Sequence, residues 1–279
     1  MVSKSRHIDA QFNLASLYYL EEETEKNLEK AFYWFHKAAE REHIEAQNKL
    51  SLLYYSGKGT EKNLEKAFYW FHKAAENGCI EAQYNLALSY ENGEGTEKNS
   101  EKAFYWYQKA VENGHIKAQH NLATLYCIGE GTEKNLEKAF YWYKKAAENN
   151  VKEAQFNLAA LYYYGEGTEK NLEKTFYWNQ KAVENGNEVA MCNLAMYYHD
   201  GKYTEKNLEK AFYWFKKSAE NDVELAMNNL AMYYKDGIGT EKNLKKAFYW
   251  YQKAIEIAQN DPKLKLSKEL DEYFKRRTN

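Results

Sequence analysis

Apolar residues recur at helical spacing through most of the chain, and residues 44–56 show the pattern clearly. Four apolar residues stand there at offsets 0, 4, 7 and 8: Ala46, Leu50, Leu53 and Tyr54. That spacing places them on one face of an amphipathic helix. Gly57 and Gly59 follow, and glycine accepts the left-handed conformation with which helices commonly end. We therefore expect a helix, called helix A, over residues 44–56.

A second amphipathic segment follows at residues 64–76. Its apolar residues form one broad side, on which small and large side chains alternate: Leu64, Ala67, Phe68, Trp70, Phe71, Ala74 and Ala75. Asn63 is suited to cap the N-terminus, where Glu65 is favourable against the helix dipole. Asn77-Gly78 is suited to end the helix. We expect this helix, called helix B, to face the core with its broad apolar side.

The pair of segments returns every 36 residues. All tryptophans of the chain fall at that interval: Trp34, Trp70, Trp106, Trp142, Trp178, Trp214 and Trp250. Self-similarity at this period is typical of a solenoid, in which each repeat packs against its neighbours. We therefore predict one all-α domain over residues 1–258, with seven antiparallel helix pairs at 7–42, 43–78, 79–114, 115–150, 151–186, 187–222 and 223–258.

The pattern changes after residue 258. Asp261-Pro262 is a typical helix start, and apolar residues that include Leu264, Leu270, Tyr273 and Phe274 follow among charged ones. We expect residues 259–279 to hold a capping helix, over 262–276, that covers the last exposed core. Its end is the basic sequence Lys275-Arg276-Arg277.

The composition limits which partners and which cellular compartment we expect. The net charge is −2, with basic and acidic residues interspersed, so we expect neither nucleic acid nor a membrane as the main partner. No run of 18 apolar residues occurs, and the N-terminus lacks an apolar signal segment. The three cysteines, Cys79, Cys127 and Cys192, stand at different places in their repeats and cannot form a repeated disulfide. A cytoplasmic protein is the expectation.

The repeated sequence resembles the Sel1-like repeat family, a relative of the tetratricopeptide repeat. The family unit reads roughly A-x-x-x-L-G-x-x-Y-x-x-G-x-G-V-x-x-D-x-x-K-A-x-x-W-Y-x-K-A-A-x-x-G, and Ala82 to Gly114 read AQYNLALSYENGEGTEKNSEKAFYWYQKAVENG. The resemblance covers residues 10–256. It implies a right-handed α/α superhelix with the helices A along a concave face. It also implies a protein-interaction adaptor in signalling or quality-control complexes.

Several positions depart from the family pattern. Alanine or serine replaces the glycine that follows leucine, as at Ala87 and Ser51. In repeat five, Asn179 replaces the aromatic residue after Trp178, and Thr175 replaces alanine. An amide in an aromatic position loses packing and needs a polar partner, at a cost of roughly 2–4 kcal/mol. We predict that repeat five is the weakest repeat and a hinge.

The residues that vary most between repeats lie on helix A, opposite the face of Ala46 and Leu50. These positions, three in each repeat, form a strip suited to an extended or helical peptide of a protein partner. The expected contact residues are Phe12, Tyr19, Asn48, Tyr55, Tyr84, Leu88, Glu91, His120, Phe156, Tyr163, Met196, His199, Asn228, Met232 and Lys235; Ser16, Leu52, Thr124, Cys127, Ala160 and Cys192 complete the strip. We expect Phe156, Tyr163 and Tyr84 to be the anchors. The alternative is that the strip only varies as solvated or inter-repeat packing positions.

A second row of residues lies on the Lys/Glu side of helix B: Tyr33, Tyr69, Tyr105, Tyr141, Tyr177, Tyr213 and Tyr249. Self-association or phosphorylation would be functional interpretations of this outer tyrosine row. The simpler interpretation, which we favour, is that each tyrosine lies flat over lysine stems and inter-repeat grooves.

The sequence indicates neither a metal site nor a catalytic site. His120 with Cys127, and Cys192 with His199, are seven residues apart, about 10 Å along a helix, whereas zinc holds four ligands at about 2.0–2.3 Å. No nucleophile elbow, P-loop, kinase or zinc-protease motif occurs. We expect no enzyme, no catalytic residue, no metal and no cofactor.

Three other functions compete with the protein-binding scaffold. An RNA-binding solenoid would need a basic channel, and Lys235 is the only basic residue of the strip. A self-assembling structural array is the second alternative. The third is β-lactam binding or hydrolysis, which has been linked with some bacterial relatives; their repeats carry paired cysteines that this chain lacks.

Overall fold

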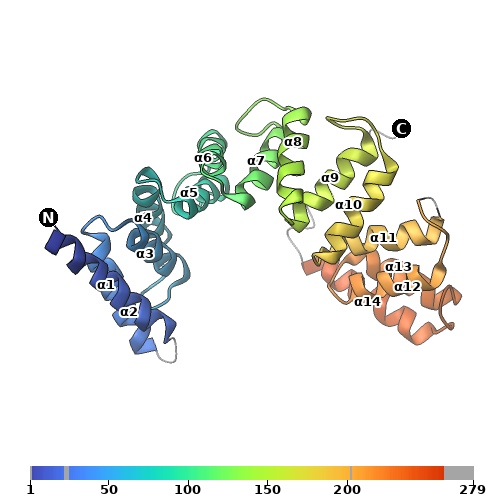
Figure 1. Ribbon diagram of the computed structural model, residues 1–279. Helices are drawn as coiled ribbons and strands as arrows, with labels where there is room; N and C mark the ends of the chain where they lie inside the picture. Colours follow the sequence, from blue (N-terminus) through green and yellow to red (C-terminus); the bar gives the residue numbers. More distant parts are fainter. Residues whose placement is uncertain (1, 22–24, 202, 261–279) are drawn as a thin grey trace. The chain divides into compact units, whose positions relative to one another are not determined.

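The computed structural model describes residues 2–21, 25–201 and 203–260 (Figure 1). Within these residues the chain forms fourteen helices and no strand. The helices are α1 (Val2–Leu20), α2 (Glu25–Ala39), α3 (Ile44–Ser56), α4 (Leu64–Glu76), α5 (Ile80–Asn92), α6 (Ser100–Glu112), α7 (Ile116–Ile128), α8 (Leu136–Glu148), α9 (Lys152–Tyr164), α10 (Leu172–Glu184), α11 (Glu188–Asp200), α12 (Leu208–Ala219), α13 (Glu224–Asp236) and α14 (Leu244–Asn260). The all-α array of seven helix pairs is therefore confirmed.

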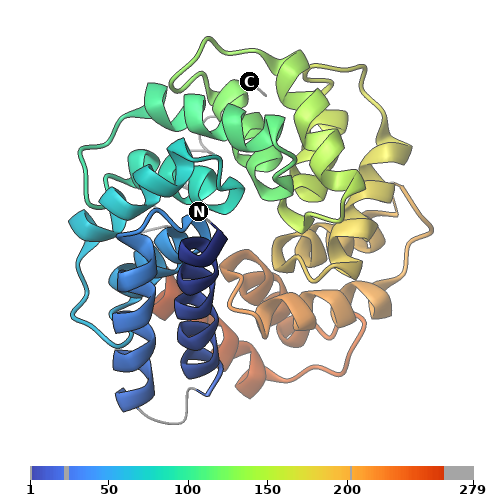
Figure 2. The same cartoon turned by 60° about the vertical axis from the view of Figure 1, so that its left-hand side comes forward.

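The chain divides into two compact parts, Met1–Asn149 and Asn150–Asn279, which we call the N-terminal and C-terminal bodies. In each body, every helix packs against the helices next to it in sequence. Helix α1, in dark blue, lies side by side with α2, in lighter blue, in Figure 2. The division falls where repeat four meets repeat five. The right-handed course of the superhelix stays a prediction.

The helix ends of repeat two agree with the prediction. Helix α3 covers Ile44–Ser56 and α4 covers Leu64–Glu76. Gly57 adopts the left-handed conformation, with φ +74°, and its N–H donates to the Leu53 carbonyl. The Asn63 side chain accepts a hydrogen bond from the backbone N–H of Lys66 at 2.8 Å. Local capping chemistry therefore sets both boundaries.

The predicted core is largely the observed one. The apolar face of α3 is buried, as are Ala67, Trp70 and Phe71 of α4. Leu64 and Phe68, which we expected in the core, are only partly buried. The reason for Phe68 is its place at the edge of the repeat, where its ring meets Tyr90 of α5 edge-on at 5.2 Å.

This Phe–Tyr contact is the repeated joint between a helix B and the following helix A. In the N-terminal body it joins Phe32 to Tyr54, Phe68 to Tyr90 and Phe104 to Tyr126, each at 5.2 Å. In the C-terminal body it joins Phe212 to Tyr234 at 5.3 Å. We call this contact the Phe–Tyr joint. The equivalent pair between repeats five and six, Phe176 and Tyr198, is looser, with ring centroids 6.5 Å apart.

The second glycine after helix A makes an equally constant contact. The loop at Gly95 lies so close to α4 that a Cβ there would be 2.0 Å from the Leu64 carbonyl oxygen. Gly59 and Gly131 approach the preceding helix B in the same way. Gly78, in contrast, has nothing within 4 Å of a built Cβ. The glycine at position 95 is thus required by space as well as by backbone conformation.

Repeat five accommodates its two polar departures with hydrogen bonds. Thr175 is completely buried, and its hydroxyl donates to the Asn171 carbonyl at 2.9 Å. Asn179, also buried, donates to the Thr175 carbonyl at 3.0 Å and to the Tyr197 hydroxyl at 3.1 Å. The amide therefore has the polar partner that we expected it to need. That this repeat is the weakest, and a hinge, stays a prediction.

Two histidines cap helices A. The Nδ1 atom of His115 accepts a hydrogen bond from the Ala118 N–H at 3.0 Å, and its Nε2 atom lies 3.5 Å from Glu81. His43 caps α3 in the same way. Burial lowers the pKa of His115, although Glu81 opposes the shift. The cap requires an unprotonated Nδ1, so the neutral ring is the stabilising form.

The predicted capping helix over 262–276 and the basic tail lie outside the described residues. Helix α14 continues to Asn260 and has 17 residues, whereas α10 has 13. None of the described helices is both long and apolar enough to cross a membrane.

Replacing Gly95 by alanine is expected to destabilise the chain more than replacing Gly78. Both have positive φ, which costs a residue with a side chain about 1–2 kcal/mol. Because only the Cβ at 95 would overlap a carbonyl, we expect Gly95→Ala to lower the free energy of unfolding by about 1–3 kcal/mol more than Gly78→Ala. Denaturant unfolding followed by circular dichroism measures both, and equal losses would contradict the close approach.

His115→Asn is expected to flatten the pH dependence of stability. A folded-state pKa below the ordinary value of about 6.5 means that the stabilisation by His115 is complete above about pH 6.5 and is lost as pH falls through the lower folded value. Asparagine keeps a cap without titrating, as Asn187 does for α11. The measurement is the free energy of unfolding at pH 7 and pH 5.

His115→Ala separates the two roles, because it removes the cap as well as the titration. We expect it to cost about 1 kcal/mol at pH 7, where His115→Asn costs less. If His115→Asn loses as much stability between pH 7 and pH 5 as the wild type, the assignment of His115 is wrong.

Candidate partner-binding surface

The strip predicted on the helices A is a surface in both bodies. All fifteen expected contact residues are at least partly exposed, and Tyr55 and Lys235 are exposed outright. The N-terminal strip consists of Phe12, Tyr19, Asn48, Tyr55, Tyr84, Leu88, Glu91 and His120. The C-terminal strip consists of Phe156, Tyr163, Met196, His199, Asn228, Met232 and Lys235. Of the six residues that complete the strip, Cys192 alone is buried. It is 1% exposed and packs in the core of the C-terminal body.

The first aromatic residue of a repeat's strip also packs against the next repeat. Phe12 stacks on His43 with ring centroids 4.5 Å apart. Tyr84 stacks on His115 at 4.3 Å. Phe156 packs against the cluster that includes Ala190 and Leu194 of the next repeat. These rings therefore hold neighbouring repeats together and present only their remaining surface outward.

A buried tyrosine supports the N-terminal strip from below. Tyr107 is completely buried, and its hydroxyl donates to the Glu91 carboxylate. The same hydroxyl accepts a hydrogen bond from Asn121 Nδ2 at 2.8 Å. Asn121 Oδ1 in turn lies 3.0 Å from His120 Nδ1. Burial, and then Glu91, raises the pKa of Tyr107, so the hydroxyl stays protonated and fixes the carboxylate.

A second buried hydroxyl meets the next position of the same strip. Tyr143 of α8 is buried, and its hydroxyl lies 2.9 Å from Thr124 Oγ1. The ring of His120 lies 5.6 Å from that of Tyr143. The polar groups of this part of the strip are therefore held in place from helix B.

The C-terminal strip has a comparable support. His199 Nδ1 lies 2.6 Å from the hydroxyl of Tyr233, whose side chain is buried. Burial, together with Asp200, raises the pKa of Tyr233 to about 12. The hydroxyl is therefore protonated at neutral pH and can donate to Nδ1. This contact fixes the orientation of the imidazole on the strip.

These supporting tyrosines are candidate site residues that the sequence did not indicate. Tyr107 and Tyr143 stand where repeats one and two have Phe35 and Phe71. Tyr233 stands where repeat two has Leu53. Tyr107 and Tyr143 each add one hydroxyl to a position that holds phenylalanine in repeats one and two, and Tyr233 replaces leucine by an aromatic ring with a hydroxyl. The replacement of phenylalanine or leucine by tyrosine was the available signal.

Lysines lie over three tyrosines near the loop end of the strip. The Nζ atoms of Lys58, Lys62 and Lys170 lie 5.7, 5.8 and 5.3 Å from the ring centroids of Tyr19, Tyr55 and Tyr163 respectively. The Tyr55 hydroxyl also donates to Glu94 at 3.3 Å. The loop end of the strip thus carries aromatic, basic and acidic groups together.

The contacts of the outer tyrosine row agree with the simpler interpretation, in which the tyrosines pack against lysine side chains. Its seven tyrosines are 48–54% exposed, and each meets the following tryptophan edge-on at 4.9–5.2 Å. A lysine four residues on lies over the ring in several repeats, as Lys73 does over Tyr69 at 5.1 Å. Lysine partners within the same helix are found for Tyr33, Tyr69, Tyr105, Tyr141 and Tyr177.

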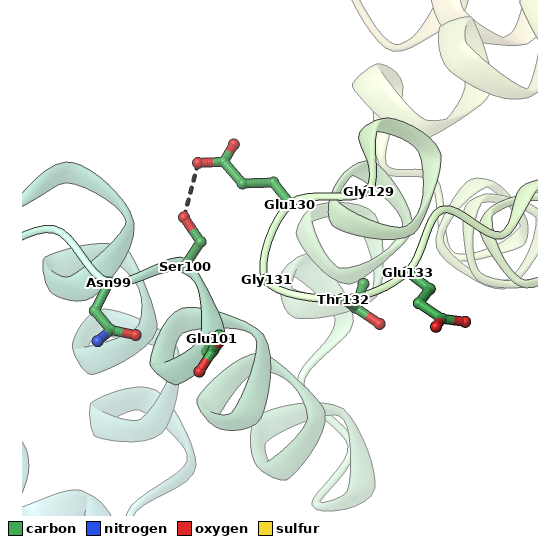
Figure 3. A pocket seen from close by; sticks show the side chains of 8 residues that line it. All are labelled: Asn99, Ser100, Glu101, Gly129, Glu130, Gly131, Thr132 and Glu133. Carbon is green, nitrogen blue, oxygen red and sulfur yellow. Dashed lines mark hydrogen bonds between the residues drawn. The ribbon is translucent and has the colours of Figure 1, made fainter.

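A shallow pocket lies between repeats three and four, at the start of α6 (Figure 3). Ser100, which replaces the leucine of other repeats, donates to Glu130 at 2.7 Å, and Lys98 lies 2.9 Å from Glu130. Hydrogen bonds from Lys98 and then Ser100 lower the pKa of Glu130. The carboxylate is thus an ion-paired bridge between repeats. Among the described residues, no group of three or more His, Cys, Asp or Glu side chains could hold a metal ion.

Comparisons with known proteins agree on the family. The Sel1 repeat model matches residues 8–43, 44–79, 80–115, 116–151, 152–187, 189–223 and 225–257. A Sel1 repeat protein from Oxalobacter formigenes is 30% identical, with a TM-score of 0.79 over 94% of this chain and 76% of that one. A protective antigen of uropathogenic Escherichia coli strains, displaying an SLR fold, is also 30% identical, with a TM-score of 0.79 over 93% of this chain.

This chain spans 55% of the length of that antigen. An immunity protein from Pseudomonas aeruginosa, 20% identical with a TM-score of 0.50 over 78% of this chain and 82% of that one, shares the fold alone. No match was found among curated proteins. Seven matched repeats cover nearly all of the described residues, and the chain belongs to the Sel1 repeat family.

Proposed function

We propose that the chain is a non-catalytic scaffold that binds a segment of a partner protein along the helix A strip. The observation that carries this proposal is the contrast between a repeated buried frame and fifteen surface residues that differ from repeat to repeat. Sel1 repeat proteins are generally protein-interaction scaffolds. The role we infer is assembly of a signalling complex in the cytoplasm.

The chemistry of the strip suits a peptide segment with both apolar and charged side chains. Half-exposed aromatic rings such as Tyr84 and Tyr163 offer large, stiff contact surfaces, which are typical of binding hot spots. Glu91 and His120 are fixed by the Tyr107 and Asn121 hydrogen bonds. Polar groups held in place before binding lose little entropy on contact. The strip therefore combines apolar anchors with oriented hydrogen-bonding groups.

Replacing strip residues by lysine is expected to weaken partner capture. Tyr55 and Leu88 lie on the N-terminal strip, and the variant Tyr55→Lys/Leu88→Lys would place two charges there. Anchors of this kind are worth about 2 kcal/mol or more, so we expect at least about a tenfold loss of affinity. The measurement is affinity capture from native extract, with cross-linking mass spectrometry to map the contact on this chain.

The matched control is Tyr69→Lys/Tyr105→Lys, which places the same charges on the outer tyrosine row. We expect the control to capture the same proteins as the wild type, and circular dichroism to give equal helix content for all three chains. Capture lost only in the control would move the site to the outer row. Capture of RNA that high salt removes would replace the proposal by nucleic-acid binding.

A further inference from the structure

Glu91 is the only acidic residue of the strip. It stands on α5 after Tyr84 and Leu88, at spacings of four and three residues, so the three side chains share one helix face. All three are partly exposed. The carboxylate therefore lies next to an apolar pair, on the surface to which the partner segment is proposed to bind.

The hydroxyl of Tyr107 holds this carboxylate from inside the N-terminal body. Tyr107 is completely buried, and its hydroxyl donates to Glu91 Oε2. The oxygen of the same hydroxyl accepts a hydrogen bond from Asn121 Nδ2 at 2.8 Å, so its own proton is left for the carboxylate. A buried hydroxyl without a partner is costly. Tyr107 therefore fixes the position of Glu91 before any partner binds.

The carboxylate of Glu91 keeps the capacity to accept further hydrogen bonds. An ionised carboxylate has about four acceptor positions on its two oxygens, and Tyr107 occupies one of them. Within the residues that the structure describes, no basic side chain forms an ion pair with Glu91. Lys98, whose charge acts on Glu91 at longer range, lies 2.9 Å from Glu130. Glu91 thus presents a fixed negative charge on the strip.

The side chains beside Glu91 suit the stem of a long basic residue. Tyr84 packs on the buried ring of Tyr107, with ring centroids 6.0 Å apart, and keeps part of its surface exposed. Lysine and arginine lay their aliphatic stems along apolar and aromatic surfaces while their charged ends reach polar partners. An acidic residue at the same place would meet a like charge, which opposes binding. Charge complementarity therefore favours a cation.

We propose that Glu91 pairs with a lysine or arginine side chain of the bound segment, whose stem lies along Leu88 and Tyr84. Tyr107 is the positioning residue of this pair. The pairing rests on the proposed function, because it names the chemistry of one partner side chain on the same strip. Since no other strip position is acidic, this pair also sets the register of the segment on the N-terminal strip.

Selection of random peptides displayed on phage tests the pairing with the full chain. Peptides that also bind Tyr55→Lys/Leu88→Lys are discarded, so that those kept depend on the strip. We expect the kept peptides to share a lysine or arginine at one position. Selection on Glu91→Lys is expected to replace it by aspartate or glutamate. The matched control is Glu112→Lys, which makes the same charge change on helix B of the repeat and is expected to keep the basic position.

A double-mutant cycle between chain and peptide measures the pair itself. A selected peptide is compared with a copy in which norleucine replaces the lysine, or citrulline the arginine. A hydrogen bond between charged groups is lost in the copy, so we expect the wild type to bind it about tenfold more weakly. We expect Glu91→Gln to bind the two peptides equally.

Tyr107→Phe tests the positioning role, and phenylalanine is the residue of repeats one and two at this place. We expect the preference for the charged peptide to fall while the affinity for the neutral copy stays, which a general loss of structure would not produce. Circular dichroism compares the helix content of all variants. An unchanged preference would show that Tyr107 does not position Glu91.

The outcomes separate this pairing from the proposed function. Strip-dependent peptides without a shared basic position, or a charge preference that persists in Glu91→Gln, would overturn the pairing alone. If no peptide distinguishes the wild type from Tyr55→Lys/Leu88→Lys, the proposed function and the pairing both fail.

Discussion

The tyrosine near the end of a helix A, such as Tyr54, Tyr90 or Tyr234, holds three helices together, and the packing of successive repeats depends on it. The ring of Tyr54 meets Phe32 of the preceding helix B edge-on at 5.2 Å. Lys66 of the following helix B lies over the same ring, 5.4 Å from its centroid. The backbone carbonyl of Tyr54 accepts a hydrogen bond from the N–H of Asn63, the cap of that helix, at 2.9 Å. One residue therefore sets the position of helix A against both neighbours.

This constraint explains where the chain is free to vary. A helix A that packs against one helix B on each side has two faces committed to the core, and its third face is left for other contacts. The strip lies on that third face, so its residues can change without loss of the frame. Two strip residues, Phe12 and Tyr84, are less free to vary. Their rings stack on the histidines that cap the next helix A, so they also take part in packing between repeats.

Much of the fold could be predicted because it depends on local patterns. The bounds of α3 and α4, the Asn63 cap and the Gly57 helix end follow from spacing and capping chemistry within a few residues. The positions of the strip residues follow from the same helical period. What they bind stays a prediction.

The contacts that reach between helices were not predictable from the period. The hydroxyl of Tyr107 touches Glu91 and Asn121, which belong to two different helices A. The side-chain amide of Asn179 donates a hydrogen bond to the hydroxyl of Tyr197, a residue of the next repeat. Cys192 is buried although its position is partly exposed in other repeats. Such contacts depend on the distance between packed helices, which the sequence of one repeat does not specify.

A double-mutant cycle at Phe68 and Tyr90 measures whether the two rings stabilise each other across the Phe–Tyr joint. Phe68→Leu and Tyr90→Leu each remove one ring of a Phe–Tyr joint while keeping an apolar side chain, and the free energy of unfolding is measured for both single variants and the double variant. Aromatic pairs of this geometry are worth about 0.5–1.5 kcal/mol beyond their buried area, so the account predicts a coupling energy in that range. Additive losses would show that the rings do not act as a joint between helices.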